Sequence, residues 1–314
     1  MKGNELINYV KEISDKIKNL EIRGATTIAI KAVETIKFIA QNAPDNELER
    51  ILVESLNILK NSRPTEPAMF NGLTYILTRF MKEKSGMIPE DREKLIEISD
   101  NYLKMLFDAF YKIIDIGSKL IPDGSRIMTH CHSSTVTNIL KKALEMGKSF
   151  EVISSETRPR FQGRKTAREL AEFGIKVYHI VDSSMRWAAR KFKPDLAIIG
   201  ADAITSLGTI INKIGSKLLA LVAKEFDFPF YIAATLLKLD MRTMYGEHII
   251  IEMRDPSEIW EDPPKNVVIL NPAFETVSPD YIDGIITEIG VIPPSNVVLA
   301  FKEKYPDIWL TNFE

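Results

Sequence analysis

The first third of the chain carries apolar residues at the three- and four-residue steps of an amphipathic helix. The two clearest rows are Leu6, Val10, Ile13, Ile17 and Leu20, and then Leu48, Leu52, Leu56 and Leu59. A third, longer helix is expected to begin near Pro89, because proline suits a first helical turn, and to run to about Leu120. The pattern predicts an N-terminal helical domain over residues 1–120.

After Gly124 the pattern changes to short apolar runs that alternate with helical segments. Strands are expected at 126–129, 150–153, 177–181, 196–199 and 230–233, and Val267-Val268-Ile269-Leu270 is expected to be the last core strand. Helices are expected near 139–144, 167–173 and 185–191. This alternation predicts an α/β fold, with a Rossmann-like, doubly wound, mostly parallel sheet over residues 121–314.

The composition narrows the function classes. Hydrophobic residues make up 45% of the 314 positions and charged residues 27%, which is typical of a globular protein with a sizeable core. The formal net charge of −2 argues against a nucleic-acid binder with a general basic surface. The single cysteine excludes an intrachain disulfide, and the sequence lacks a signal-peptide or membrane-spanning pattern, so we expect a cytoplasmic protein without membrane contact.

Ligands of open parallel sheets bind at the carboxyl ends of the strands. The first strand is followed by Cys131 and then by Ser133, Ser134 and Thr135, where a helix begins. Backbone N–H groups and hydroxyls at a helix start can bind a phosphate, and the same end of the helix favours a thiolate at Cys131. The alternative is that the hydroxyls are ordinary helix caps and that Cys131 is a small buried hydrophobe.

His130-Cys131-His132 invites a metal hypothesis, but one cysteine and four histidines make a structural zinc site difficult to complete, so we expect no metal. Asp202 follows the strand at 196–199 and the small residues Gly200 and Ala201. Burial there would raise the pKa of Asp202, so that it could donate a proton as well as accept one. The alternative is that Asp202 only caps a turn.

Several cationic and polar residues stand where they could reach the same sheet edge. Asn212 and Lys213 follow a strand-like run, and Lys238 follows another. In the helical part, Arg23-Gly24 opens a helix and Arg63 follows one; arginine suits bidentate phosphate binding, and glycine permits close approach of a ligand to the backbone. For any single lysine the alternative is a solvated surface charge.

In their order along the chain, these pieces resemble a known superfamily. They are RGATT, NSRPTEP, THCHSST, SSETRPRFQGRKTA, IIGADAI, INKIGS and NPAFETVSPDYIDGIITEIGVIPP. The superfamily joins methylthioribose-1-phosphate isomerases, archaeal ribose-1,5-bisphosphate isomerases and the alpha, beta and delta subunits of translation initiation factor 2B, and the resemblance covers residues 20 to 310. Cys131 and Asp202 stand at the positions of the catalytic pair, which the regulatory subunits generally lack. Their combination with Arg23, Arg63, Asn212, Lys213 and Lys238, and the segment NSRPTEP, make the chain look most like the archaeal ribose-1,5-bisphosphate isomerases. Two departures are His132, where a small polar amide is expected, and a slightly longer stretch near Arg190–Pro194.

The resemblance implies conversion of ribose 1,5-bisphosphate to ribulose 1,5-bisphosphate, in AMP and other nucleoside monophosphate degradation, without a cofactor. Cys131 is then the base at C2, and Asp202 is the acid that opens the ring and later moves a hydroxyl proton; an enol route and a hydride shift both stay open. The substrate-binding residues it implies are Arg23, Gly24, Arg63, Ser133, Ser134, Thr135, Asn212, Lys213 and Lys238. Arg158 and Arg160 are expected either in the pocket wall or in a subunit contact.

Two alternatives remain within the superfamily. One is a methylthioribose-1-phosphate isomerase, and the other is a non-catalytic regulatory subunit like those of initiation factor 2B. As partners we expect a phosphorylated ribose, a nucleotide effector and further copies of the chain, as a dimer or a hexamer built from dimers, with Ile285–Pro294 either in that contact or in the core.

Overall fold

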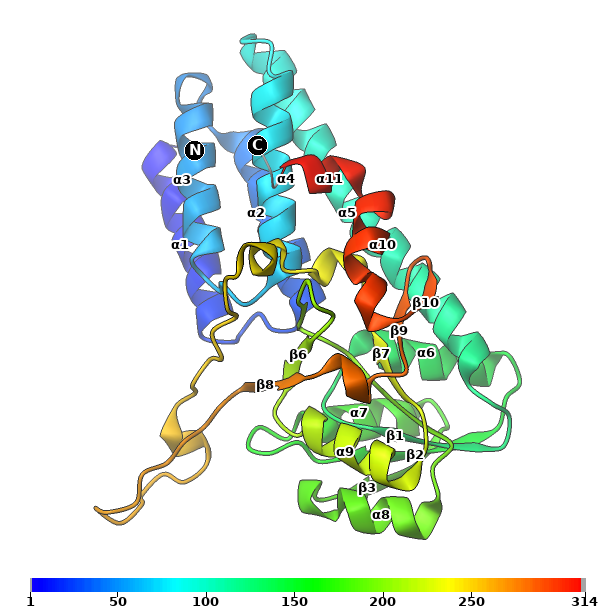
Figure 1. Cartoon of the computed structure of the whole chain (residues 1–314). Coiled ribbons are helices and arrows are strands. Elements are labelled where there is room, and N and C mark those ends of the chain that lie inside the picture. Colours follow the sequence, from blue (N-terminus) through cyan, green and yellow to red (C-terminus); the bar gives the residue numbers. More distant parts are fainter. Residues whose placement is uncertain (1, 312–314) are drawn as a thin grey trace. The chain divides into compact units, whose positions relative to one another are not determined.

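The computed structural model describes residues 2–311, which form two compact units (Figure 1). Unit 1 comprises the described residues up to Asp108, the segment Leu237–Met241 and the described residues from Phe301 onward. Unit 2 comprises Ala109–Leu236 and Arg242–Ala300. The units interleave along the chain, and a division into two domains near residue 120 stays a prediction.

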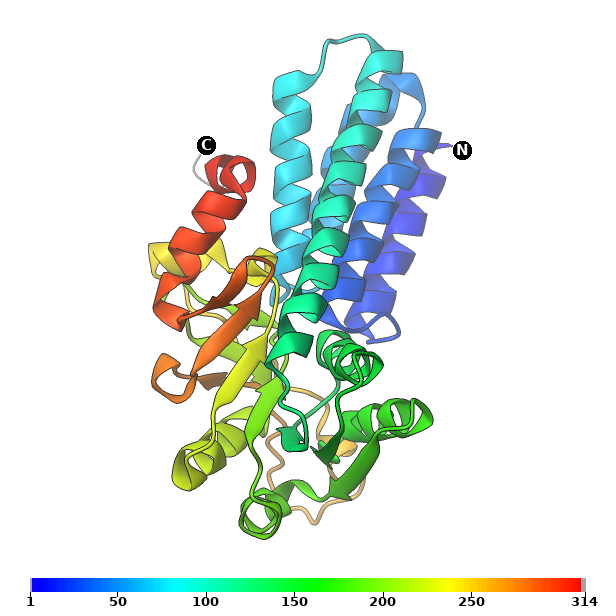
Figure 2. The same cartoon turned by 90° about the vertical axis from the view of Figure 1, so that its right-hand side faces the viewer.

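Unit 1 is built from helices that lie side by side (Figure 2), as the sequence predicted. Its helices are α1 (Gly3–Lys18), α2 (Ala25–Asn42), α3 (Leu48–Lys60), α4 (Pro67–Glu83), the first part of α5 (Ile88–Leu120) and α11 (Pro306–Thr311), with a short 3-10 helix at Asp45–Glu47. The two predicted apolar rows are buried, and α1 packs against α3. Leu20 was wrongly included in the first row, because α1 ends at Lys18 and Leu20 takes a left-handed φ of 59°.

Unit 2 contains the predicted doubly wound sheet. Its seven strands lie in the order β10-β9-β7-β4-β1-β2-β3, and all neighbouring pairs are parallel except β9 with β10. The strands are β1 (Ser125–Thr129), β2 (Phe150–Ser155), β3 (Lys176–Ile180), β4 (Leu196–Ile199), β7 (Phe230–Ala233), β9 (Gly284–Thr287) and β10 (Gly290–Ile292). A second, antiparallel sheet is formed by β5 (Ala203–Ile204), β6 (Ile210–Lys213) and β8 (Phe274–Val277).

Helices cover both faces of the large sheet: α6 and α7 on one face and α8 and α9 on the other (Figure 2). The bounds of these helices are α6 (Ser134–Glu145), α7 (Gln162–Glu172), α8 (Met185–Phe192) and α9 (Ser216–Phe226). A further helix, α10 (Val297–Lys304), lies near the C-terminus. Short 3-10 helices lie at Asp182–Ser184, Leu236–Lys238, Met241–Tyr245, Pro256–Glu258, Pro279–Tyr281 and Pro294–Asn296.

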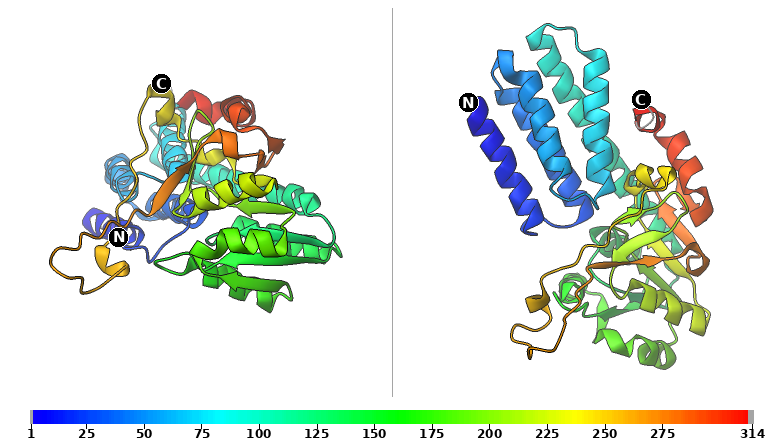
Figure 3. Two further views of the ribbon diagram at one scale, coloured as in Figure 1. Left: turned by 60° about the horizontal axis from the view of Figure 1, so that its bottom comes forward. Right: turned by 60° about the vertical axis from the view of Figure 1, so that its left-hand side comes forward.

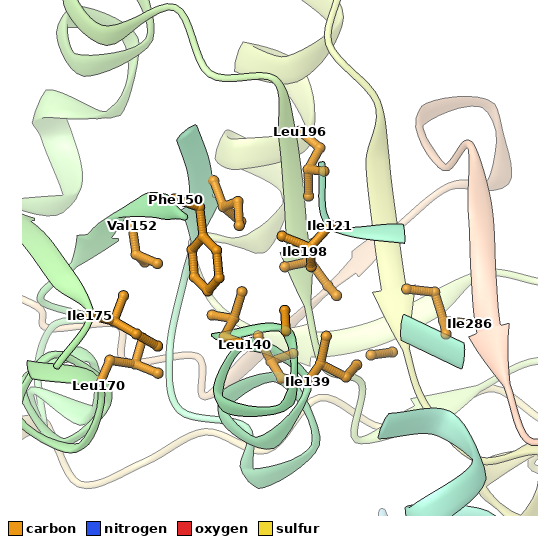
Figure 4. Close-up of a cluster of buried hydrophobic side chains, with 14 of the residues drawn as sticks. Ile121, Ile139, Leu140, Phe150, Val152, Leu170, Ile175, Leu196, Ile198 and Ile286 are labelled. Carbon is orange, nitrogen blue, oxygen red and sulfur yellow. The ribbon is translucent and has the colours of Figure 1, made fainter. Parts of the chain in front are cut away.

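The core of unit 2 fills the space between α6, α7 and the sheet (Figure 4). Ile139 and Leu140 of α6 face Phe150, Val152 and Ile198 of the strands. Burial of each large apolar side chain stabilises the fold by about 1.5–3 kcal/mol. This packing holds α6 against the sheet, and so it places the start of α6 beside the carboxyl ends of β1 and β4.

The prediction of a core strand at 267–270 is wrong. These residues belong to a segment between 246 and 272 that extends from the rest of unit 2 (Figure 3, right), and Val268 and Leu270 are 84% and 71% exposed. A single isolated β-bridge, Met253 to Pro272, joins its two sides, together with the Asn271 side chain, which donates to the Asp255 carbonyl at 2.9 Å. The last strands of the large sheet are β9 and β10, and Ile285 and Ile286 of β9 are buried core residues. Across residues 2–311, no helix combines the length and the apolar character needed to cross a membrane.

Candidate active site

The carboxyl ends of β1 and β4 form the centre of the candidate site. These two strands are parallel neighbours, so the residues that follow them meet at one edge of the sheet. Cys131 comes two residues after β1, and Asp202 comes three residues after β4. Between β4 and Asp202, a Cβ atom added at Gly200 would lie 2.7 Å from Ser133 Oγ. Only glycine permits this close approach of the end of β4 to the start of α6.

The predicted phosphate-binding hydroxyls lie at the start of α6. The Ser133 hydroxyl accepts a hydrogen bond from the backbone N–H of Val136 at 3.4 Å, so its expected role as a helix cap is confirmed. Ser134 is exposed and Thr135 is buried. The positive end of α6 therefore lies directly beside Cys131, while the binding of phosphate by these three residues stays a prediction.

Cys131 is partly accessible and takes a φ of 65°. The atoms packed around its sulfur remove enough solvent to raise the pKa of the thiol to about 12. The backbone of His132 lowers this pKa, Asp202 raises it and Lys213 lowers it. The backbone N–H of His132 favours the thiolate, as expected for the helix start, but loss of solvent outweighs it and the pKa of the thiol is raised.

The second sheet brings Lys213 to the same site. The backbone N–H of Asp202 donates to the Ile211 carbonyl at 2.9 Å, which ties the residues after β4 to β6. The Lys213 side chain is buried, and this burial lowers the pKa of its ammonium, while the charges of Cys131 and Asp202 raise it. A half-buried carboxyl, a thiol and a buried amine thus interact through charge within unit 2.

Asn212 is buried beside Lys213 and makes contacts that support the fold. Its side-chain N–H donates to Ser216 Oγ at 2.8 Å, and the Ser216 hydroxyl donates to the Lys213 carbonyl at 2.7 Å. These bonds join β6 to the start of α9. A role of Asn212 in substrate binding stays a prediction.

The other predicted binding residues belong to unit 1. Arg23 is exposed two residues before α2, and Gly24 stands directly before that helix, with a φ of 92°. A guanidinium nitrogen of Arg63 lies 3.4 Å from the Glu66 carboxylate. Lys238 is buried in the short 3-10 helix that begins at Leu236. Their participation in substrate binding stays a prediction.

Asn71 is a residue that the sequence analysis missed. It is buried in α4, and its side-chain N–H groups donate to the carbonyls of Leu237 and Leu239 at 2.9 Å each. These two carbonyls flank Lys238, so Asn71 fixes the backbone that carries this lysine. An asparagine inside a helix gave no sequence signal, because its partners lie 166 and 168 residues further along the chain.

The metal hypothesis finds no support in the arrangement of side chains. His130 Nε2 lies 2.8 Å from the Ile214 carbonyl, which can only accept, so this nitrogen carries the proton. His130 Nδ1 then accepts from the Ser155 hydroxyl at 2.6 Å, and burial lowers the pKa of the ring. Both nitrogens are thus engaged within the fold. Among residues 2–311, no three His, Cys, Asp or Glu side chains form a group that could hold a metal ion.

A doubly wound α/β unit with a thiol, a carboxyl and a buried amine at adjacent strand ends has the composition of an acid–base enzyme site. The chain belongs to the initiation factor 2 subunit family, whose profile matches residues 21–294. The resemblance and the fold class drawn from the sequence are therefore confirmed.

Proteins similar to this chain carry the names of sugar-phosphate isomerases. The chain is 41% identical over 313 residues to the ribose 1,5-bisphosphate isomerase of Pyrococcus furiosus, with 96% of each chain covered. Five further archaeal proteins of that name are 35–39% identical. The methylthioribose-1-phosphate isomerase of Carboxydothermus hydrogenoformans is 32% identical, covering 92% of this chain and 90% of its own.

Solved structures agree with the fold. A translation initiation factor eIF-2B of Pyrococcus horikoshii OT3 superposes with a TM-score of 0.78 at 32% identity, covering 91% of this chain and 97% of its own.

Proposed function

We propose that this protein is an aldose–ketose isomerase that converts ribose 1,5-bisphosphate to ribulose 1,5-bisphosphate. The observation that carries the proposal is the joint placement of Cys131, Asp202 and Lys213 at the ends of β1, β4 and β6, where their charges interact. Relatives covering nearly the whole chain carry the name of this activity. A binding subunit would have no use for an acid and a base at the start of α6.

Of the two routes left open, we propose the enol route, in which a proton leaves C2 and returns at C1. C1 bears both a phosphate and the ring oxygen, so the ring opens only when the bond between C1 and the ring oxygen breaks. The Cys131 thiolate takes the C2 proton, the electron pair forms the C1–C2 double bond, and Asp202 gives its proton to the departing ring oxygen. Asp202 then takes the proton of the C2 hydroxyl, and the Cys131 thiol returns its proton to C1. The protons balance, and Cys131 and Asp202 return to the protonation states in which they began.

This cycle starts with the proton on Asp202 and not on Cys131. In the free protein the thiol is neutral, since its pKa is raised to about 12. A proton on Asp202 removes the negative charge that raises the thiol pKa, and the Lys213 ammonium then stabilises the thiolate. Lys213 lowers the pKa of the Cys131 thiol and so favours the ionised sulfur.

Substrate phosphates need donors and cations. The backbone N–H groups and hydroxyls of Ser133, Ser134 and Thr135 are proposed to bind one phosphate at the start of α6. Positive charge for the two dianions is proposed to come from the side chains of Arg23, Arg63, Lys213 and Lys238, with Gly24 and Asn212 supplying polar contacts.

Assembly, regulation and location are also proposals. We propose a homo-oligomer, a dimer or a hexamer built from dimers, which analytical ultracentrifugation would test. A nucleotide effector and a cytoplasmic location complete the proposal. We also propose a role in nucleoside monophosphate degradation. Its support is the chemistry of the proposed substrate, a ribose that carries phosphate at both C1 and C5.

The proposal is tested by adding α-ribose 1,5-bisphosphate to the purified protein and following the carbon and phosphorus NMR signals. Ribulose 1,5-bisphosphate should appear, and Cys131→Ser and Asp202→Asn should each reduce turnover by roughly 10²–10⁴-fold. Asp262→Asn, which removes an exposed carboxyl from the extended segment, is the matched control and should keep full activity. If the protein turns over only methylthioribose 1-phosphate, that sugar replaces ribose 1,5-bisphosphate as the proposed substrate. If neither sugar reacts, the proposed isomerase function is refuted.

A further inference from the structure

The backbone of Cys131 is in an unusual conformation for a residue with a side chain. Its φ of 65° lies in the left-handed region, which residues other than glycine, asparagine and aspartate rarely enter. Such a conformation persists only when its surroundings hold it, and residues of this kind gather at functional sites. The contacts around the Cys131 peptide therefore bear on how the thiol is presented.

Two buried hydroxyls bond to the backbone of Cys131. The N–H of Cys131 donates to Thr157 Oγ1 at 2.9 Å, and the Thr166 hydroxyl donates to the Cys131 carbonyl at 2.8 Å. Thr157 and Thr166 are 0% and 1% exposed. Since both the donor and the acceptor of Cys131 are bonded to side chains from other elements, its conformation is set by tertiary contacts and not by its neighbours in sequence.

Each threonine is itself held in place. Thr157 has a φ of 62°, and its backbone N–H donates to Asp182 Oδ1 at 2.8 Å, while the N–H of Arg158 donates to Asp182 Oδ2 at 2.7 Å. One carboxylate thus clamps two successive N–H groups of the loop after β2. Thr166 also has a second partner, since its oxygen lies 3.1 Å from His132 Nδ1 and can accept a hydrogen bond from that ring nitrogen.

Thr166 reaches Cys131 because α7 lies very close to the end of β2. A Cβ atom added at Gly163 would lie 1.7 Å from the Ser155 carbonyl oxygen, so only glycine fits there. Phe161, just before α7, lies between two guanidinium groups, with Arg158 at 5.0 Å and Arg164 at 3.7 Å from its ring centroid. The sequence segment Glu156–Thr166 therefore acts as a support built around the Cys131 peptide.

We propose that Thr157 and Thr166 are positioning residues that hold the Cys131 peptide in its left-handed conformation and so aim the thiol at the substrate. This inference rests on the proposed isomerase function. Neither hydroxyl is assigned a proton in the reaction, and both act through the backbone of Cys131. The rival interpretation is that the two bonds only stabilise the fold.

The test replaces each threonine by valine, which keeps the shape and removes the hydroxyl, and by serine, which keeps the hydroxyl. Misplacement of a reacting group by about 1 Å can reduce turnover 10²-fold, so Thr157→Val and Thr166→Val should lower kcat by roughly 10- to 100-fold. KM should change less than about threefold, because the peptide does not set phosphate affinity. Serine variants should recover most of kcat. The matched control is Thr35→Val in α2, which removes an equally buried hydroxyl bonded to the Lys31 carbonyl at 2.7 Å.

A second readout needs no substrate. Cys131 is the only cysteine, so its rate of modification by methyl methanethiosulfonate reports the presentation of this one sulfur. Both valine variants should change that rate by at least about threefold at pH 8, while Thr35→Val should not change it. Normal melting temperatures with altered kcat and altered modification rates support positioning.

Unaltered kcat and modification rates in folded valine variants would overturn the positioning role, even with an active wild type. An inactive wild type would refute the proposed function instead. In that case the modification rates would still show whether the two hydroxyls determine how accessible and reactive the Cys131 sulfur is. If Thr157→Val does not fold, Asp182→Asn takes its place, because it weakens the bonds that hold the Thr157 loop and should lower kcat in the same way.

Discussion

The protonation state of Cys131 gives the most direct test of the site. Loss of solvent around the sulfur raises the thiol pKa to about 12, against an ordinary value of 9.0. At pH 8 the thiolate fraction is then about 10⁻⁴, compared with about 10⁻¹ for an ordinary thiol. The higher basicity makes the remaining thiolate roughly twentyfold more nucleophilic, so the net reaction with a thiosulfonate should be roughly 50-fold slower.

The assay is modification by methyl methanethiosulfonate between pH 7.5 and 10, with the same protein unfolded in urea as its own reference. In the folded protein the rate should rise about tenfold per pH unit without levelling off, whereas in the unfolded protein it should level off near pH 9. Slow access to the sulfur would lower the whole curve without moving its inflection, so the shape of the profile separates access from pKa.

Asp202→Asn sharpens this prediction. The Asp202 carboxylate raises the Cys131 pKa, so its removal should lower that pKa and speed modification at pH 8 while isomerase turnover falls. The opposite changes in thiol reactivity and turnover distinguish an acid from a residue that merely supports the fold. A wild-type inflection at or below pH 9, or a higher inflection in Asp202→Asn, would refute the reasoning.

Three further predictions concern the supports of the site and the helical unit. Gly163→Ala should lower the free energy of unfolding by about 3 kcal/mol or more in urea titrations, because its Cβ would lie 1.7 Å from the Ser155 carbonyl oxygen; a change below about 1 kcal/mol would contradict that close approach. Tyr102→Phe removes a buried hydroxyl that donates to a carbonyl of α4 at 2.5 Å, and should cost about 1 kcal/mol in the same titrations, while an unchanged midpoint would show that the bond contributes nothing. Asn71→Ala removes two buried hydrogen bonds to the carbonyls beside Lys238 and should cost about 2 kcal/mol; if Lys238 binds phosphate, steady-state kinetics should also show a raised KM, and an unchanged KM would remove Lys238 from the binding residues.

Most of the secondary structure could be predicted from the chain alone, because periodicity is a local property. The rows ending at Ile17 and Leu59 are buried helical faces, and the runs from 126 to 233 form the predicted parallel strands. The exception at 267–270 has a physical reason. An apolar run becomes a strand only when a neighbouring strand pairs with it, and Val268 extends into solvent instead.

The location of the site followed from a topological rule, and the fold places Cys131 and Asp202 at neighbouring strand ends as that rule requires. The state of the thiol did not follow. The helix start that follows Cys131 in sequence suggested a thiolate, whereas the desolvation and the Asp202 charge that raise its pKa come from atoms distant in sequence.

Local pattern alone therefore determined the elements, their order and the residue types available for proton transfer. Tertiary packing determined which of them act together. Lys213 arrives through a second sheet, and Thr157 and Thr166 reach the Cys131 peptide from 26 and 35 residues away. Burial, charge and the left-handed backbone of Cys131 depend on distances between such segments, which periodicity along the chain does not encode.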